Sequence, residues 1–437
     1  MNLISQQSSS LNGAVICPGD KSISQRIVII GSLLNCEMQI NGFLNAEDPI
    51  STSNALNELG ASIFFDQKKV ILKKRKIPFK DAAVDLNFGN SGTGSRLMLG
   101  LICGLGLKSK LIGDKSLSKR PMNRIIKPLL EMGAEIESNN GMLPISTMGS
   151  KIRDNFEYKM PIASAQVKSC LLLSALASKK NIKIVEPKIT RDHTERMIEF
   201  FGGEITYGNN LNPRIIELKS CNIQSKGQYN VPGDFSSAAF IIVATIISKN
   251  SETLIKNVGL NKTRNGLLKV LNLMGADIEI KNKKIISNEE VGDIIVKSSN
   301  LTGINVPEDI IPNIIDEIPI LSIAASFANG ITEIKNAAEL RVKESDRLDA
   351  ISLGLSKLNI QHDIYDDGIS IIGTSKDVIC EDAIDSFDDH RIAMSFLVSG
   401  IRSKNFVCVR NCKNIETSFP NFTKTMNLLG MRIHEQN

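Results

Sequence analysis

A short motif recurs along the chain and constrains the fold more than any other feature of the sequence. An apolar helix end is followed by a Gly, then one or two residues, and then a β-prone run. Gly is the residue expected in the left-handed conformation just after a helix, and Asn also adopts it. The copies recur at a spacing of roughly 70 residues, which suits a supersecondary unit larger than a solenoid repeat. They are centred on Gly60, Gly133, Gly202, Gly275, Asn359 and Gly430.

Each of the six units also contains two helix candidates with their own start signals, namely Ser, Thr or Asp caps or an early Pro. The first helices are expected to begin near Ser22, Thr93, Ser164, Ser236, Asp316 and Asp389. The second are expected near Pro49, Pro121, Asp192, Thr263, Ser345 and Pro420. Short β-prone runs lie between them, such as 69–72, 182–185 and 370–372. The pattern predicts an α/β protein of two similar domains with three units in each.

The domain boundary is expected where Val231-Pro232-Gly233 interrupts the repeat. Residues 17–231 then form the N-terminal domain. Residues 1–16 and 232–437 form a discontinuous C-terminal domain, whose last unit is completed by the N-terminal strand within Ser9 to Ile16. The two chain crossings, near residues 17 and 231, would act as a two-strand hinge.

Composition excludes several classes of protein. A chain of 437 residues with 42% hydrophobic and 23% charged residues is globular and too long for one core. A net charge of +5 without a basic tract or any Trp favours acidic small molecules over nucleic acid. The eight Cys include no CxxC pair, so neither zinc nor disulfides are expected. No leader peptide and no apolar run of membrane-spanning length occur, so a cytoplasmic protein is expected.

The most charged stretch, Arg341 to Arg347, precedes a helical pattern of apolar residues. Ser345 is expected to cap that helix, and Lys343 and Arg347 lie four residues apart, on one helical face, with Glu344 between them. Helix N-termini favour anions, so an acid among these cations is suited to proton transfer beside a phosphate or carboxylate. A solvated, salt-bridged helix start is the alternative interpretation.

Other helix starts carry cationic or Gly-rich groups as well. Each alone also fits a capped surface helix, but together they predict a cleft that attracts a small polyanion. His193 fits a capping role better than a catalytic one, and no metal-ligand cluster accompanies the cations, so neither metal nor cofactor is expected. The motifs are Lys21-Ser22 with Arg26, Gly89 to Arg96, Lys119-Arg120-Pro121, Ser164-Ala165-Gln166, Arg191 to Glu195, Asp316-Glu317 and Asp388 to Arg391.

This set of motifs, in this order over the whole chain, resembles the 5-enolpyruvylshikimate-3-phosphate synthase family. Arg191 to Glu195, Ser164-Ala165-Gln166 and Thr417-Ser418-Phe419-Pro420 are similar to its second bacterial subclass. Thr417 stands where the first subclass has a Lys, so no role passes to Thr417. The resemblance implies two domains of three βαβαββ units each, an inverse α/β prism.

The resemblance also implies a transferase of the shikimate pathway, which leads to chorismate and aromatic amino acids. It would move the enolpyruvyl group of phosphoenolpyruvate to the 5-hydroxyl of shikimate 3-phosphate through a tetrahedral intermediate, releasing phosphate. Glu344 would be the acid and Asp316 the base, with Lys21 beside both substrates. Shikimate 3-phosphate would be held by Lys21, Ser22, Arg26, Ser164, Gln166, Arg191, Asp316 and Lys343. Phosphoenolpyruvate would be held by Lys21, Gly92, Arg120, Gln166, Arg347 and Arg391.

Two alternatives stay open at this point. A UDP-N-acetylglucosamine enolpyruvyl transferase would share the repeat fold, but it places a reactive Cys in the loop corresponding to Gly113–Arg120, which has none. A non-catalytic anion-binding repeat protein would need neither Glu344 nor Asp316. The resemblance further implies a monomer, small-molecule partners only with neither nucleic acid nor membrane, and sensitivity to glyphosate because position 92 is Gly rather than Ala.

Overall fold

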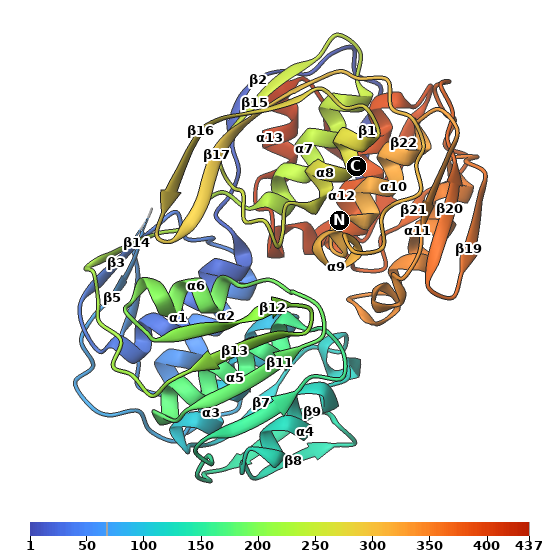
Figure 1. Cartoon of the computed structure of the whole chain (residues 1–437). Coiled ribbons are helices and arrows are strands. Elements are labelled where there is room, and N and C mark those ends of the chain that lie inside the picture. Colours follow the sequence, from blue (N-terminus) through green and yellow to red (C-terminus); the bar gives the residue numbers. More distant parts are fainter. Residues whose placement is uncertain (67–68, 437) are drawn as a thin grey trace. The chain divides into compact units, whose positions relative to one another are not determined.

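The computed structural model describes residues 1–66 and 69–436, and these form two compact units (Figure 1). Unit 1 comprises Met1–Pro18, Pro232–Lys284 and Glu290–Asn437, and unit 2 comprises Gly19–Val231 and Ile285–Glu289. Each unit has its own cluster of buried apolar side chains. The chain passes between the two units near residues 18 and 231. Residues 285–289, the tip of one hairpin of unit 1, belong to unit 2.

Unit 2 contains three four-stranded sheets that share one strand order. In each sheet an edge strand pairs in parallel with the next strand, and the remaining pairs are antiparallel. The first sheet has the order β14 (Gln228–Asn230), β3 (Met38–Asn41), β5 (Lys69–Leu72) and β4 (Ile63–Asp66). The second has the order β6 (Leu86–Asn87), β7 (Lys108–Ile112), β9 (Met142–Met148) and β8 (Ile136–Asn139). The third has the order β10 (Phe156–Lys159), β11 (Ile182–Glu186), β13 (Arg214–Leu218) and β12 (Ile205–Leu211).

Two helices accompany each sheet of unit 2, as the repeat predicts. They are α1 (Lys21–Leu34), α2 (Glu47–Glu58), α3 (Gly92–Leu105), α4 (Asn123–Glu131), α5 (Ala165–Ser178) and α6 (His193–Phe200), with a short 3-10 turn η1 (Leu117–Lys119). The first helix of each pair, α1, α3 or α5, is largely buried, which agrees with its apolar sequence.

Unit 1 repeats this plan with one variation. Its first sheet has the order β2 (Asn12–Ile16), β15 (Glu252–Gly259), β17 (Glu289–Lys297) and β16 (Ile278–Ile286). The second has the order β18 (Ile331–Ile334), β20 (Gly368–Ile372) and β19 (His362–Tyr365). The third has the order β21 (Ile384–Asp385), β22 (Phe406–Arg410), β1 (Leu3–Gln6) and β23 (Arg432–Glu435). In the three-stranded sheet, isolated parallel bridges from Thr302 to Asn329 and from Asn305 to Glu333 stand in the place of the edge strand.

The N-terminal segment completes the C-terminal unit differently from the sequence expectation. Residues 9–16 were expected to close the last sheet, and this is wrong. The closing strand is β1, whose buried Leu3 and Ser5 place it between β22 and β23 with antiparallel partners on both sides. Strand β2 instead pairs in parallel with β15 in the first sheet of unit 1. One N-terminal segment therefore supplies strands to two sheets.

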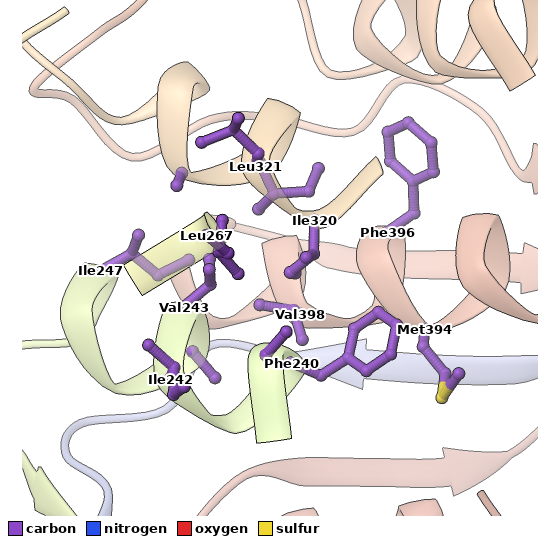
Figure 2. Close-up of a cluster of buried hydrophobic side chains, with 14 of the residues drawn as sticks. Phe240, Ile242, Val243, Ile247, Leu267, Ile320, Leu321, Met394, Phe396 and Val398 are labelled. Atoms are coloured by element: carbon purple, nitrogen blue, oxygen red, sulfur yellow. The ribbon is translucent and has the colours of Figure 1, made fainter. Parts of the chain in front are cut away.

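The helices of unit 1 surround one large core. They are α7 (Phe235–Ile247), α8 (Gly266–Leu273), α9 (Ile311–Ile314), α10 (Ile318–Ser326), α11 (Arg347–Lys357), α12 (His390–Ser399) and α13 (Phe422–Leu429), with 3-10 turns η2 (Ala338–Val342), η3 (Gly400–Arg402) and η4 (Cys412–Thr417). Every residue of α7 is buried, as expected for a helix that is apolar on all sides. Figure 2 shows Phe240 of α7, Ile320 of α10 and Phe396 of α12 within this core.

The repeated Gly motif has the predicted backbone conformation. The second helix of each unit is followed by a residue with positive φ: Gly60 (98°), Gly133 (102°), Gly202 (82°), Gly275 (94°), Asn359 (56°) and Gly430 (114°). The degenerate copy at Asn359 thus uses a residue type that enters this region more readily than most. Among the described residues, no helix combines the length and the hydropathy needed to cross a membrane.

Candidate functional site

The first group of predicted ligands lies at the start of α1 in unit 2. Asp20 caps this helix by accepting a hydrogen bond from the backbone N–H of Ile23 at 2.9 Å. Lys21, the first helical residue, pairs with Asp48 of α2 at 3.1 Å. Ser22 follows it and is partly exposed. The carboxylate of Asp20 is thus used as the helix cap.

Arg26, one turn further along α1, is buried rather than exposed at the helix start. Its guanidinium donates to the hydroxyl of Thr194 at 2.8 Å, to the hydroxyl of Ser169 at 3.1 Å and to the carbonyl of Ser22 at 3.0 Å. Arg26 therefore joins α1, α5 and α6 in addition to any ligand role.

A second group forms where α3 begins. Ser91 caps α3, and Gly92 is its first residue. A Cβ atom at position 92 would lie 3.1 Å from Nη1 of Arg120 and 3.1 Å from Nη1 of Arg96. Arg120 also donates to the hydroxyl of Ser116 at 3.1 Å and to Asn90. Because Gly92 has no side chain, the guanidinium groups of Arg96 and Arg120 can lie this close to the start of α3.

Gln166 belongs to the same group, although it is far away in the sequence. Its side-chain oxygen accepts from Arg96 at 2.9 Å, and its nitrogen donates to Thr93 at 3.1 Å. These contacts are possible because α3 and α5 pack very closely: a Cβ atom at Gly100 would lie only 2.2 Å from the carbonyl oxygen of Cys170. The starts of α3 and α5 are thus held side by side.

The remaining predicted ligands of unit 2 are Ser164, at the start of α5, and Arg191, just before α6. Ser164 caps α5 by accepting from the N–H of Val167 at 3.4 Å. Arg191 lies in the loop between β11 and α6 and is partly exposed. Asp192, next to it, pairs with Arg196 at 3.0 Å.

In unit 1 a single guanidinium organises the predicted site. Arg347 contacts Glu344 at 2.6 Å, Asp389 at 2.7 Å and Asp316 at 3.3 Å. The Arg347 side chain is only 1% exposed, whereas Asp316 and Glu344 are 16% and 22% exposed. The two carboxylates proposed for acid–base chemistry thus share one buried cation and both reach the surface.

Arg391 and Lys343 lie around the same Asp316. Nη1 of Arg391 donates to the backbone carbonyl of Asp316 at 3.0 Å, and its other nitrogen is 3.9 Å from the Asp316 carboxylate. Lys343 is also 3.9 Å from that carboxylate. Unit 1 therefore brings Asp316, Lys343, Glu344, Arg347 and Arg391 together, from three separate parts of the sequence.

Two details of the charged stretch differ from the sequence expectation. Ser345 does not cap α11; Asp346 does, by accepting from the N–H of Asp349 at 3.2 Å, and Ser345 donates to Asp389 instead. Lys343 and Arg347 do not share a helical face, because α11 begins only at Arg347. The 3-10 turn η2 and a non-helical bend position Lys343, so that both cations still reach Asp316.

Two pKa values in unit 1 are shifted in opposite directions. Burial lowers the pKa of Lys343, and the nearby Asp316 and Glu339 oppose this only in part. Burial also disfavours the charged form of Arg347, but Asp389, Glu344 and Asp316 outweigh it and raise its pKa. Arg347 is therefore a permanent cation, whereas Lys343 loses its proton more easily than an ordinary lysine.

The sequence interpretation missed several residues of both groups. Arg96 and Asp389 were seen in motifs but not singled out as partners of Gln166 and Arg347. Lys168 interrupts an apolar helical run, and a lone cation in such a run signals a buried charge that needs carboxylate partners. Cys103 is buried, and burial raises the pKa of its thiol to about 12. Within residues 1–66 and 69–436, no group of His, Cys, Asp and Glu side chains is arranged to hold a metal ion.

Comparison with known proteins gives one consistent result. The family model described as EPSP synthase (3-phosphoshikimate 1-carboxyvinyltransferase) matches residues 5–426. The 3-phosphoshikimate 1-carboxyvinyltransferase of Petrotoga mobilis is 46% identical over 422 residues, covering 95% of this chain and 96% of the relative. That of Legionella pneumophila (strain Philadelphia 1) is 42% identical over 438 residues, covering 100% and 99%. A solved EPSP synthase structure from Acinetobacter baumannii has a TM-score of 0.86 at 36% identity, covering 99% of this chain and all of that one.

Proposed function

Because this chain belongs to the EPSP synthase family, we propose that the charged groups of its two units bind the two substrates of that reaction. The chain is a transferase of the shikimate pathway, and it moves the enolpyruvyl group of phosphoenolpyruvate to shikimate 3-phosphate. The observation that supports the site assignment most directly is the carboxylate pair Asp316 and Glu344 on the buried Arg347. A reaction that moves protons around two phosphorylated substrates needs such acids among cations.

Shikimate 3-phosphate is assigned mainly to unit 2. Lys21 and the helix starts capped by Asp20 and Ser164 supply cations and backbone N–H groups suited to its phosphate. The full set is Lys21, Ser22, Arg26, Ser164, Gln166 and Arg191, with Asp316 and Lys343 of unit 1 for its hydroxyl groups and carboxylate.

Phosphoenolpyruvate is assigned to the remaining cations. Arginine forks bind phosphate and carboxylate groups through paired hydrogen bonds. The absence of a side chain at Gly92 leaves space beside Arg120. The set is Lys21, Gly92, Arg120 and Gln166 of unit 2, with Arg347 and Arg391 of unit 1.

The chemistry then has two balanced steps. In the addition step the 5-hydroxyl oxygen bonds to C2 of phosphoenolpyruvate while its proton passes to Asp316, and Glu344 gives a proton to the methylene carbon C3. In the elimination step Glu344 takes a proton back from the new methyl group, the bond from C2 to the phosphate oxygen breaks, and phosphate departs with the proton that Asp316 held. Lys21 and the arginines stabilise the phosphate charge in both steps.

Phosphate release by the purified protein tests this function. We expect release from phosphoenolpyruvate with shikimate 3-phosphate and none with UDP-N-acetylglucosamine. Neither alternative is supported by the comparisons, since the relatives from Petrotoga mobilis and Legionella pneumophila are both named 3-phosphoshikimate 1-carboxyvinyltransferase. Release with the nucleotide sugar alone would mean that the acceptor is misassigned.

The lowered pKa of Lys343 predicts an early loss of shikimate 3-phosphate binding on the alkaline side. As pH rises through this lowered pKa, the site loses one positive charge while the substrate phosphate keeps both negative charges. We expect the KM for shikimate 3-phosphate to begin to rise at a pH below about 10.4, the ordinary pKa of a lysine. The Lys343→Arg variant keeps its charge up to about pH 12, so its KM for shikimate 3-phosphate should not rise in this pH range. The control is Lys357→Arg at an exposed position, which should keep the pH dependence of the unsubstituted enzyme. The same rise of KM with pH in Lys343→Arg would contradict the assignment.

The space at Gly92 predicts sensitivity to glyphosate and its loss on substitution. A methyl group in Gly92→Ala would displace the Arg120 and Arg96 guanidinium groups from 3.1 Å. We expect glyphosate to inhibit the unsubstituted enzyme, and its inhibition constant to rise on the order of tenfold or more in Gly92→Ala, about 1.4 kcal/mol of binding free energy. The KM for shikimate 3-phosphate in the same variant serves as the control and should change much less. Full turnover of the unsubstituted enzyme in a large excess of glyphosate would contradict this prediction.

We further propose a monomeric protein of the cytoplasm, whose two units are its domains. The eight cysteines, all in the thiol form, fit a reducing compartment. The division at Pro18 and Val231 supports motion about the crossings there. Sedimentation with and without both substrates would test the monomer and any compaction on binding.

A further inference from the structure

A buried ion cluster lies inside unit 2, beneath the residues assigned to shikimate 3-phosphate. Lys168 of α5 is fully buried and pairs with Glu195 at 2.8 Å and with Glu186 at 3.0 Å, both also fully buried. The third hydrogen of its ammonium group goes to the backbone carbonyl of Thr190 at 3.3 Å. Thr190 in turn donates from its hydroxyl to Glu186 at 2.9 Å. The ammonium group of Lys168 therefore faces two carboxylates and one carbonyl oxygen.

A buried ion cluster of this kind contributes little net free energy to the stability of a fold. The desolvation of one cation and two carboxylates costs free energy that a well-packed apolar core would not lose. Burial accordingly raises the pKa of Glu195, although Lys168 opposes the shift. An explanation for the cluster is thus better sought in what it holds in place.

The three partners of Lys168 enclose the loop that carries Arg191. Glu186 is the last residue of β11, Thr190 directly precedes Arg191, and Glu195 lies in the first turn of α6. Lys168 itself stands two residues after Gln166 and four after the cap Ser164. One ammonium group thus connects the start of α5 to the beginning, the middle and the end of the Arg191 loop.

A second polar layer links the same elements. The hydroxyl of Thr194, beside Glu195, donates to Ser169, beside Lys168, at 2.7 Å, and Arg26 donates to both hydroxyl oxygens. Two neighbouring contacts, Lys168 with Glu195 and Ser169 with Thr194, therefore hold α5 against α6. Ser164, Gln166 and Arg191 have little freedom to move apart.

We propose that Lys168, Glu186 and Glu195 are positioning residues for shikimate 3-phosphate, which fix the Arg191 loop against the start of α5. The proposal rests on the ligand assignment of the preceding section. It predicts that the loss of the cluster weakens the binding of this substrate. Phosphoenolpyruvate shares only Gln166 among the residues held by the cluster, and its assigned arginines lie elsewhere, so its binding should be affected much less.

A pair of substitutions at Glu195 separates positioning from simple stability. Glu195→Leu removes one acceptor of Lys168 and leaves the ammonium paired with Glu186. Glu195→Gln has a similar size and keeps a carbonyl oxygen that accepts the hydrogen bond. Lys183→Met, which removes the exposed pair of Lys183 with Glu157 in the same sheet, is the matched control.

The measurements are the dissociation constant of shikimate 3-phosphate by calorimetry and both KM values by phosphate release. For Glu195→Leu we expect the dissociation constant and the KM of shikimate 3-phosphate to rise on the order of 10- to 100-fold, as for a misplaced ligand group. The KM of phosphoenolpyruvate should change far less. Glu195→Gln should recover most of the loss, and Lys183→Met should match the unsubstituted enzyme.

Each outcome decides one question. Equal affinity for shikimate 3-phosphate in Glu195→Leu and the unsubstituted enzyme would overturn the positioning role alone, as would an equal rise of both KM values. No binding of shikimate 3-phosphate by the unsubstituted enzyme would overturn the ligand assignment and the positioning role with it. If Glu195→Leu does not fold, Lys168→Met/Glu186→Gln/Glu195→Leu replaces the cluster by neutral groups and is judged by the same two criteria.

Discussion

Glu344→Gln is expected to lower kcat by on the order of 100- to 10 000-fold, the range that one positioned acid or base contributes. Gln has the size of Glu, and its amide oxygen can still accept from Arg347, which now lies 2.6 Å from the carboxylate. The geometry of the site should therefore survive. The amide has no proton to give to the methylene carbon of phosphoenolpyruvate, so the addition step should fail.

Substrate binding and turnover must be measured together for this variant. Phosphate release at saturating substrates gives kcat, and calorimetry with shikimate 3-phosphate shows whether binding is intact. The matched control is Glu339→Gln, a carboxylate of η2 that lies 3.8 Å from Lys343 and is 41% exposed, and it should leave kcat nearly unchanged. A Glu344→Gln enzyme that keeps its kcat would remove Glu344 from the mechanism and leave the acid unassigned.

The parts of the fold that were predictable from the sequence are those that local chemistry determines. A residue such as Gly133 or Asn359 after a helix signals its end through the φ it must adopt, and this signal located the repeat. Caps such as Ser164 and Asp389 located helix starts for the same reason. These signals involve neighbours within a few residues, so a single sequence contains them in full.

The parts that were not predictable depend on distant residues. Arg347 meets Asp389 and Asp316, which are 42 and 31 residues away in the sequence, and nothing near Arg347 indicates either partner. The cap of α11 was misplaced by one residue because Ser345 and Asp346 are both good caps, and the contact of Ser345 with Asp389 decides between them. The role of β1 depends on pairing with β22 and β23, which both lie 400 or more residues later in the sequence. Only the tertiary fold resolves such choices.

The second large effect expected is on stability, from Arg347→Met. The Arg347 guanidinium is 1% exposed and lies within 3.3 Å of three carboxylates, of which Asp389 is fully buried. Methionine has a comparable length but no charge, so the substitution leaves Asp389 in the interior without its cation. The removal of one partner of a buried pair costs about 3–5 kcal/mol of the free energy of unfolding. The KM for phosphoenolpyruvate should rise as well, since Arg347 is one of its assigned ligands.

Scanning calorimetry would measure this loss, because a protein of two units need not unfold in a single step and calorimetry resolves the transition that unit 1 undergoes. Arg341→Met is the matched control: Arg341 also pairs with two carboxylates, Asp346 and Asp349, each at 2.9 Å, but it is 29% exposed. Its loss should cost no more than about 1 kcal/mol. In the double variant Arg347→Met/Asp389→Asn the buried charge is gone, so part of the lost stability should return. Equal stability of Arg347→Met and Arg341→Met would mean that the Arg347 cluster does not hold α11 and α12 together, and that Asp316 and Glu344 owe their positions to other contacts.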